Sequence, residues 1–280
     1  MTKLEYTFKS DILFKTLFVK NQGLLKQLIA DLLRIDVKSI TDFVVTNPEI
    51  PPDIIGNKVC RLDINMLIDN IVVDIELQVY NENNYPERTL YYWAREYSLA
   101  LEEGEDYSKL PQVIVISIMH FKLFECPEYY SDFFVLEKTR HTQLTDKLRL
   151  MYFELPKFTN KISKNNNLDT WLSLFKAETK EELDQIAKMG VHVMEKTVRE
   201  YYKVTAEQEL RNRERMLFDA SNIEASRMNQ ARREGEAIGE KRGEKRGEKR
   251  GEKLANKKWQ GVVEEKDALI KELQAKLNNQ

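Results

Sequence analysis

The stretch RLDINMLIDNIVVDIELQ, residues 61–78, decides the fold. Both of its halves alternate apolar with polar residues, a pattern typical of strands that bury one face. Asp69 and Asn70 between the halves both tolerate a positive φ angle, which indicates a tight turn. The sequence therefore predicts an antiparallel hairpin of residues 61–68 and 71–79, in which facing residues have numbers that sum to 139, as 69 and 70 do.

The predicted register gives the hairpin two different faces. One face is wholly apolar, whereas the other pairs Asn65 with Asp74 and Asp63 with Glu76, and carries Gln78 near its end. A slip of one residue would mix the two faces, so their clean separation supports the register. Because directly opposed like charges are destabilising, Asp63 and Glu76 are expected either to share a proton or to bind a divalent cation. An amphipathic hairpin with a solvated polar face is the alternative interpretation.

The composition narrows the kind of metal site and the compartment. The two cysteines, Cys60 and Cys126, lack metal-ligand spacing and the three histidines are scattered, so a metal would have to be held by oxygen. Mg²⁺ prefers such ligands and commonly takes one or two carboxylates. No apolar run reaches the roughly 18 residues of a membrane span, and residues 1–10 lack a signal-peptide apolar stretch. We expect a soluble protein of a reducing compartment, the cytoplasm, with no membrane partner.

The charge is distributed unevenly along the chain. The net charge is −2, yet residues 232–258 hold eleven Lys and Arg against six Glu. The remaining body is therefore acidic overall and is not a nucleic-acid binder by bulk charge. Any attraction for phosphate must come from a local patch, a bound cation or the basic tail.

Several separated motifs resemble those of a known family. Asp63, followed by Glu76-Leu77-Gln78, resembles the D...(D/E)-x-K signature of the PD-(D/E)XK nuclease superfamily, with glutamine in place of lysine. The resemblance extends to DILFK at 11–15, RLD at 61–63, the helical segment 88–97 and FELPKF at 153–158. Together these motifs, over about residues 8–200, are similar to the recombination-promoting nuclease (Rpn) family, also labelled PD-(D/E)XK family transposases.

The resemblance implies a fold, an activity and a set of residues. The fold would be α/β and restriction-endonuclease-like, with a mixed sheet flanked by helices. The activity would be that of a bacterial, Mg²⁺-dependent DNA endonuclease, associated with recombination or mobile elements, and Mn²⁺ could replace Mg²⁺. Asp63, Glu76 and Gln78 would form the catalytic set, with Asp63 and Glu76 holding the metal and Asp11 completing its shell. Asp11 could equally be a first-turn acid placed against the helix dipole.

Gln78 departs from the superfamily pattern in a way that matters for the chemistry. An amide can orient a water molecule, but it can neither accept its proton nor supply positive charge. Either the metal with the phosphate or solvent takes that proton, or a lysine elsewhere, such as Lys15 or Lys58, fills the gap. Both lysines are also candidate DNA contacts. Slow or tightly conditioned cleavage is therefore expected.

Two arginines are further candidates for contact with DNA. Arg88, Tyr92 and Arg95 share one face of the helix predicted after the hairpin, so Arg88 and Arg95 could present guanidinium groups to the DNA backbone. Structural pairing with Glu102 or Asp106 is the alternative interpretation.

The remaining pattern predicts four segments. They are a nuclease-like core at 1–158, a helical extension at 168–233, Gly-rich charged four-residue repeats at 234–258 and a short coiled coil at 259–280. Predicted helices are two within 10–33 broken near 21–23, then 85–103, 171–176, 181–202 and 206–233, and further strands are 113–119 and one within 148–155, with a loop at 46–57.

The tail is expected to depend on a partner. Glycine recurs at every fourth position from Gly235 to Gly251, and each interior glycine costs a helix on the order of 1 kcal/mol, so the repeats alone should be mostly unfolded. Val263, Ile270, Leu273 and Leu277 fall on heptad positions of a short coiled coil, which indicates homo-oligomerisation. A solvated low-complexity tail is the alternative.

The sequence thus favours an endonuclease that acts on DNA. The competing hypothesis is a catalytically weak DNA-binding or oligomerising interaction protein that keeps the nuclease fold.

Overall fold

The computed structural model describes residues 2–46, 49–50, 60–61, 64–159 and 166–277. Its helices are α1 (Asp11–Lys20), α2 (Gln22–Leu33), α3 (Tyr85–Leu99), α4 (Asn167–Lys176), α5 (Lys180–Ala187), α6 (His192–Ala206) and α7 (Gln208–Leu277). Its strands are β1 (Phe43–Thr46), β2 (Glu49–Ile50), β3 (Cys60–Arg61), β4 (Ile64–Ile68), β5 (Ile71–Gln78), β6 (Gln112–Met119), β7 (Tyr130–Leu136) and β8 (Gln143–Glu154).

The central element is a six-stranded mixed sheet with the order β1-β4-β5-β6-β8-β7. β1, β4 and β5 form an antiparallel meander, whereas β5, β6 and β8 run parallel, and β7 pairs antiparallel to β8 at the edge. Parallel neighbours need a crossover connection, and α3 provides it between β5 and β6. β2 and β3 pair with each other apart from this sheet.

The predicted hairpin register is confirmed for residues 64–68 and 71–75, but Arg61, which was predicted to face Gln78, pairs instead with Glu49 of β2. The five pairs run from Ile64 opposite Ile75 to Ile68 opposite Ile71, and each pair has numbers that sum to 139. Of the two turn residues, Asp69 alone adopts a positive φ angle, 51°. Its carboxylate accepts hydrogen bonds from the backbone of Thr41 and Asp42, which fastens the turn and lowers the pKa of Asp69.

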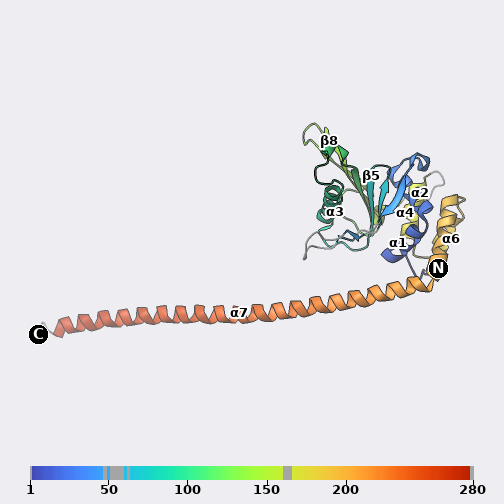
Figure 1. Cartoon of the computed structure of the whole chain (residues 1–280). Coiled ribbons are helices and arrows are strands. Elements are labelled where there is room, and N and C mark those ends of the chain that lie inside the picture. Colours follow the sequence, from blue (N-terminus) through green and yellow to red (C-terminus); the bar gives the residue numbers. More distant parts are fainter. Residues whose placement is uncertain (1, 47–48, 51–59, 62–63, 160–165, 278–280) are drawn as a thin grey trace. The chain divides into compact units, whose positions relative to one another are not determined.

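One face of the sheet packs against helices from both ends of the fold. The apolar face of the hairpin and alternate residues of β6 share one core with α1, α2, α4, α5 and α6. The predicted break between the first two helices falls at Asn21, which ends α1 and begins α2. Figure 1 shows the sheet with α1, α2, α4 and α6 on one side and α3 on the other.

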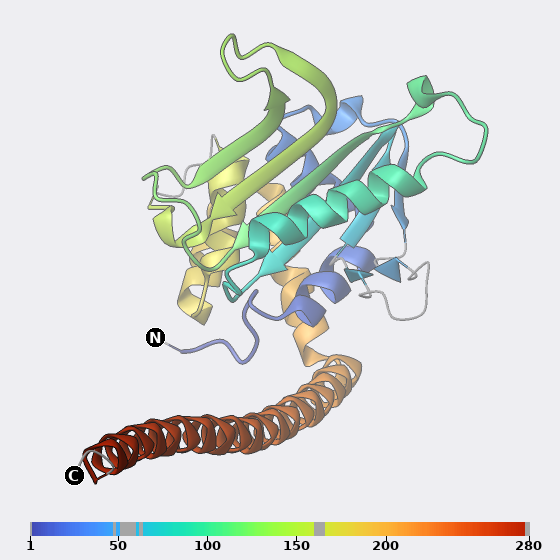
Figure 2. The same ribbon diagram turned by 90° about the vertical axis from the view of Figure 1, so that its left-hand side faces the viewer.

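The second face of the sheet is covered by α3, as Figure 2 shows. A smaller core joins Tyr85 of α3 to Val115, Met119 and Tyr152 of the central strands. A hydrogen bond of 2.6 Å between the hydroxyls of Thr89 and Tyr152 ties the middle of the helix to β8. The central strands are thus buried on both sides, as the uninterrupted β-branched stretch of β6 predicts.

Four features differ from the sequence prediction. β1 and β7 were not expected, β2 lies within the predicted loop 46–57, and β8 begins at Gln143, five residues before the predicted segment. β1 and β7 are both sheet edges with partly exposed side chains, so their apolar patterns are weak. The predicted helix 181–202 is instead two helices, α5 and α6, separated at Gly190, where φ is 74°.

The chain divides into two compact units, Met1–Glu214 and Arg215–Gln280. The expectation of a mostly unfolded glycine repeat is wrong in this structure, because α7 continues through all five glycines of the repeat. In three of the five units the other residues are Glu, Lys and Arg, which are all good helix formers and offset the cost of glycine. None of the helices in the described part of the chain carries an apolar stretch long enough to cross a bilayer.

Candidate active site under helix α3

The polar face of the hairpin is buried, and the alternative of a solvated polar face is wrong. Asn65 is 5% exposed, Asp74 is fully buried and Glu76 is 4% exposed, while Gln78 is partly exposed at the end of β5. The reason is that α3 crosses this face of the sheet. The sequence prediction that Asp74, Glu76 and Gln78 share one face therefore stands, but the face looks towards a helix.

At one end of this polar face, three strands and the helix contribute to one buried network. The Asn65 amide donates a hydrogen bond of 2.5 Å to Asp74 Oδ1, and its own oxygen accepts from the Thr46 hydroxyl. Asp74 Oδ2 has no hydrogen-bond partner among the described residues. Burial, and then the nearby Glu96 and Glu76 carboxylates, raise the pKa of Asp74 well above its usual value.

Glu96 of α3 is a member of this network that the sequence did not indicate. Burial raises the pKa of Glu96, against the opposing effects of the hydrogen bond from Asn65 and the charge of Arg95. Burial therefore disfavours the charged forms of both Asp74 and Glu96 at this end of the face.

At the other end of the face, Gln78 is fixed by two hydrogen bonds. Arg88 Nη2 donates to Gln78 Oε1 over 2.5 Å, and Gln78 Nε2 donates to the carbonyl oxygen of Tyr80 over 2.9 Å. The same Nη2 lies 3.8 Å from Glu76 Oε2, and Nη1 lies 3.4 Å from Glu82 Oε2. None of these contacts of Arg88 involves Glu102 or Asp106, the two residues named as its partners in the alternative interpretation.

Aromatic rings hold the guanidinium of Arg88 in place. It lies over the Tyr85 ring at 4.8 Å and the Tyr92 ring at 5.9 Å, one turn away on either side along α3. Tyr85 is itself buried, and burial together with the charge of Glu76 raises the pKa of its hydroxyl. The site is therefore an ordered layer of carboxylates, amide and guanidinium rather than a solvated surface.

His120 directly follows β6, at the same end of the strands as Gln78. Its backbone N–H donates to the Gln78 carbonyl oxygen over 2.9 Å. Burial, and then the charge of Lys9, lower the pKa of the His120 side chain to about 4. Lys9 pairs with Glu178 at 2.6 Å, which brings the residues just before α1 and those just before α5 to this edge.

The predicted metal set is only partly visible. Asp63 lies outside the described residues, and Asp11 is exposed at the first turn of α1, where its carboxylate accepts from the Ile12 N–H. Among the residues that the structure describes, no three His, Cys, Asp or Glu side chains gather closely enough to hold a metal ion. Glu76 nevertheless offers an oxygen ligand of the type that Mg²⁺ prefers, on the strand that the signature requires.

The predicted DNA contacts differ in exposure. Arg95 is 8% exposed and lies beside Glu96, whereas Lys15 is partly exposed on α1. Lys58 lies outside the described residues.

Two residues of the FELPKF motif, at 153–158, stabilise a loop. Glu154 and Lys157 form a buried ion pair of 2.6 Å, with side chains 0% and 7% exposed. Glu154 Oε1 accepts from the backbone N–H groups of Leu123 and Phe124, and Lys157 donates to the Phe124 carbonyl oxygen. The pair thus fastens the loop between β6 and β7.

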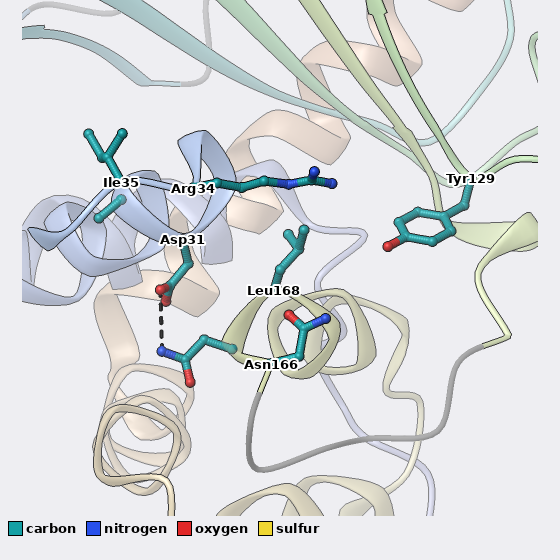
Figure 3. A pocket seen from close by; sticks show the side chains of 8 residues that line it. Asp31, Arg34, Ile35, Tyr129, Asn166 and Leu168 are labelled. Atoms are coloured by element: carbon teal, nitrogen blue, oxygen red, sulfur yellow. Dashed lines mark hydrogen bonds between the residues drawn. The ribbon is translucent and has the colours of Figure 1, made fainter.

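A separate pocket of about 440 Å³ lies between α2 and α4 (Figure 3). Arg34 and Tyr129 extend into it from different elements, and Asp31 accepts a hydrogen bond from Asn167 over 3.2 Å. Asp31 also accepts from the buried Trp171 indole over 2.8 Å. The pocket is lined by none of the residues of the polar face on β5.

The fold and the strand motif together define the class of protein. A six-stranded mixed sheet flanked by helices is consistent with the PD-(D/E)XK nuclease fold. The chain belongs to the PD-(D/E)XK nuclease family transposases, whose family model matches residues 8–228. No curated protein and no solved structure matches the chain.

Proposed function

We propose that the protein is a Mg²⁺-dependent endonuclease that hydrolyses phosphodiester bonds of DNA, with a role in recombination or mobile elements. The observation that carries the proposal is the Glu76-x-Gln78 strand end, with Glu76 buried, within a chain of the PD-(D/E)XK nuclease family. Mn²⁺ is expected to support the same activity.

Asp63 and Glu76 are proposed as the metal ligands. The proposal extends the register of the described pair Ile64 and Ile75 by one residue, to Asp63 and Glu76. Directly opposed residues have Cβ atoms roughly 4.5–5.5 Å apart, which two carboxylates tolerate when a cation lies between them. Asp11 is proposed as a further ligand. A bound Mg²⁺ would supply Lewis-acid stabilisation of the negative charge that builds on the phosphate.

The chain's own residues would then bind and orient the substrate. Gln78 is proposed to orient the attacking water, since an amide cannot remove its proton. His120, with its lowered pKa, stays neutral at neutral pH and adds no charge to this edge of the sheet. Lys15, Lys58, Arg88 and Arg95 remain proposed contacts to the DNA backbone, although the burial of Arg95 leaves little of it to reach a phosphate.

A second candidate function is a catalytically weak DNA-binding or oligomerising protein that keeps the fold. The observation that favours it is the engagement of Gln78, whose oxygen and nitrogen both have protein partners. In either case, α7 is proposed to form a coiled coil with a second copy of the chain through its last heptads.

A supercoiled-plasmid assay in Mg²⁺ tests the proposed function. The full-length protein is compared with the double variant Asp63→Ala/Glu76→Ala, each after the same purification. Nicking by the wild type alone supports the endonuclease. Equal nicking by both proteins points to a contaminant and removes that support.

Binding of Mn²⁺ separates the two candidates independently of cleavage. The endonuclease is expected to gain thermal stability with Mn²⁺, whereas Asp63→Ala should gain none. An equal response of wild type and variant would favour the interaction protein.

A further inference from the structure

Arg88 connects three groups of the candidate site. Its Nη2 donates to Gln78 Oε1 over 2.5 Å and lies 3.8 Å from Glu76 Oε2, while Nη1 lies 3.4 Å from Glu82 Oε2. It is thus the cationic side chain that the structure places between the two members of the Glu-x-Gln motif.

The guanidinium is held firmly before any substrate binds. Its side chain is 24% exposed, and the rings of Tyr85 and Tyr92 lie at 4.8 and 5.9 Å. Its Nε–H is buried and meets no hydrogen-bond acceptor within the described part of the chain. Charged groups fixed in this way need no reorganisation during a reaction, which makes their electrostatic effect large.

The chemistry of a guanidinium limits what Arg88 can do. It stays protonated at any ordinary pH, so it cannot act as the base that removes a proton from water. It can donate hydrogen bonds and carry a fixed positive charge. Those are the properties that the amide of Gln78 lacks.

We propose that Arg88 is a positioning residue of the cleavage site, which fixes the Gln78 amide and places beside Glu76 the positive charge that a glutamine cannot supply. The inference rests on the proposed function. It differs from a contact to the DNA backbone, because the contacts of Arg88 are to the motif itself.

The inference predicts two effects of opposite sign. Removing the charge should slow cleavage, because negative charge on the phosphate loses a partner. It should also tighten cation binding, because a positive charge 3.8 Å from a Glu76 oxygen competes with a metal for it. A purely structural arginine would give another result: loosening α3 would weaken cation binding and cleavage together.

The experiment uses four full-length variants beside the wild type: Arg88→Met, Arg88→Lys, Gln78→Lys/Arg88→Met, and the control Arg199→Met. Arg199 has a side chain 65% exposed on α6, away from the polar face. Plasmid cleavage gives kcat and KM, titration calorimetry with Mn²⁺ alone gives the cation affinity, and melting curves check folding.

The expected kcat of Arg88→Met is about 10- to 100-fold lower, with KM changed about threefold or less, as when a transition-state contact is removed. Its Mn²⁺ affinity should rise about three- to tenfold. Arg88→Lys should recover part of kcat, and Gln78→Lys/Arg88→Met should exceed Arg88→Met in kcat, because the lysine restores the charge. Arg199→Met should match the wild type.

Unchanged kcat and unchanged Mn²⁺ affinity in a folded Arg88→Met would overturn the inference. So would weaker Mn²⁺ binding in Arg88→Met with no recovery in either lysine variant. The proposed function fails separately, when Asp63→Ala/Glu76→Ala cuts as well as the wild type. If the wild type does not cut DNA, the Mn²⁺ affinities of the same variants still decide the role of Arg88.

Discussion

Asn65 of β4 donates a hydrogen bond to Asp74 of β5 in a layer that α3 seals from solvent. Asp74 is the fully buried acid of this layer, and burial with the charges of Glu96 and Glu76 raises its pKa. The ionised form of Asp74 is therefore unfavourable in the folded protein.

Replacing Asp74 by asparagine should preserve stability, because the new amide oxygen can still accept from Asn65 and brings no charge. We expect the free energy of unfolding at neutral pH to stay equal or to rise by about 1–2 kcal/mol. Asp74→Ala is the matched control, and it should lose about 2 kcal/mol because the Asn65 amide loses its acceptor. Urea unfolding measures both, and a marked loss in Asp74→Asn would show that the charge itself is needed.

His120 should make the protein sensitive to mild acid. Its folded-state pKa of about 4 lies below the ordinary 6.5, so the unfolded chain binds more protons between these values. Its contribution is complete above pH 6.5 and is lost as pH falls through that window. The facing charges are Lys9, which lowers the pKa, and Glu178, which raises it.

Lowering the pH from 7.5 to 5 should cost about 1–2 kcal/mol of unfolding free energy through His120. His120→Gln should show a smaller pH dependence over the same range, and His141→Gln, which replaces an exposed histidine, is the matched control. Chemical unfolding at the two pH values measures the difference. Identical slopes in all three proteins would contradict the assignment.

Removing one partner of the Glu154–Lys157 ion pair should destabilise the protein more than removing both partners. Lys157→Met leaves a carboxylate with 0% exposure beside two backbone donors, and we expect a loss of about 3–5 kcal/mol. Glu154→Gln/Lys157→Met removes both charges, so it should lose clearly less. Thermal and urea unfolding test this, and a double variant as unstable as Lys157→Met would refute it.

Gln78 should matter for cleavage although it is not a base. Gln78→Ala frees Arg88 Nη2 and removes the amide proposed to orient water, so kcat should fall about tenfold or more. Gln185→Ala serves as the control on α5, outside the polar face. Equal rates for wild type and Gln78→Ala would remove the glutamine from the proposed mechanism.

The parts of the fold that the sequence predicted have strong internal patterns. The hairpin register followed from Asp69 and Asn70 alone, and β6 followed from its run of β-branched residues. The edge strands β1 and β7 were not predicted, because half-exposed edge strands show only weak alternation of apolar and polar residues. The split at Gly190 also escaped, since a positive φ angle at one glycine carries no periodic signal.

The sequence indicated the candidate site residues on β5, but it did not indicate their contacts with α3. The spacing of Glu76 and Gln78 is a local pattern that a family signature records. The partners of these residues come from how α3 crosses the sheet, which no spacing in the sequence reveals. Glu96 was missed for this reason, and the contact of Arg88 with Gln78 was not predicted.

The contacts between α3 and β5 recur at matching distances along the two elements. Gln78 meets Arg88 at one end and Asp74 lies near Glu96 at the other, so the helix runs back along the strand. Four strand residues rise about 13 Å and eight helix residues about 12 Å, a near match of two different repeats. Substitutions that alter the contacts between the two elements should therefore be made in pairs, one on the strand and one on the helix. Position 76 would be paired with position 92, midway between the two observed contacts.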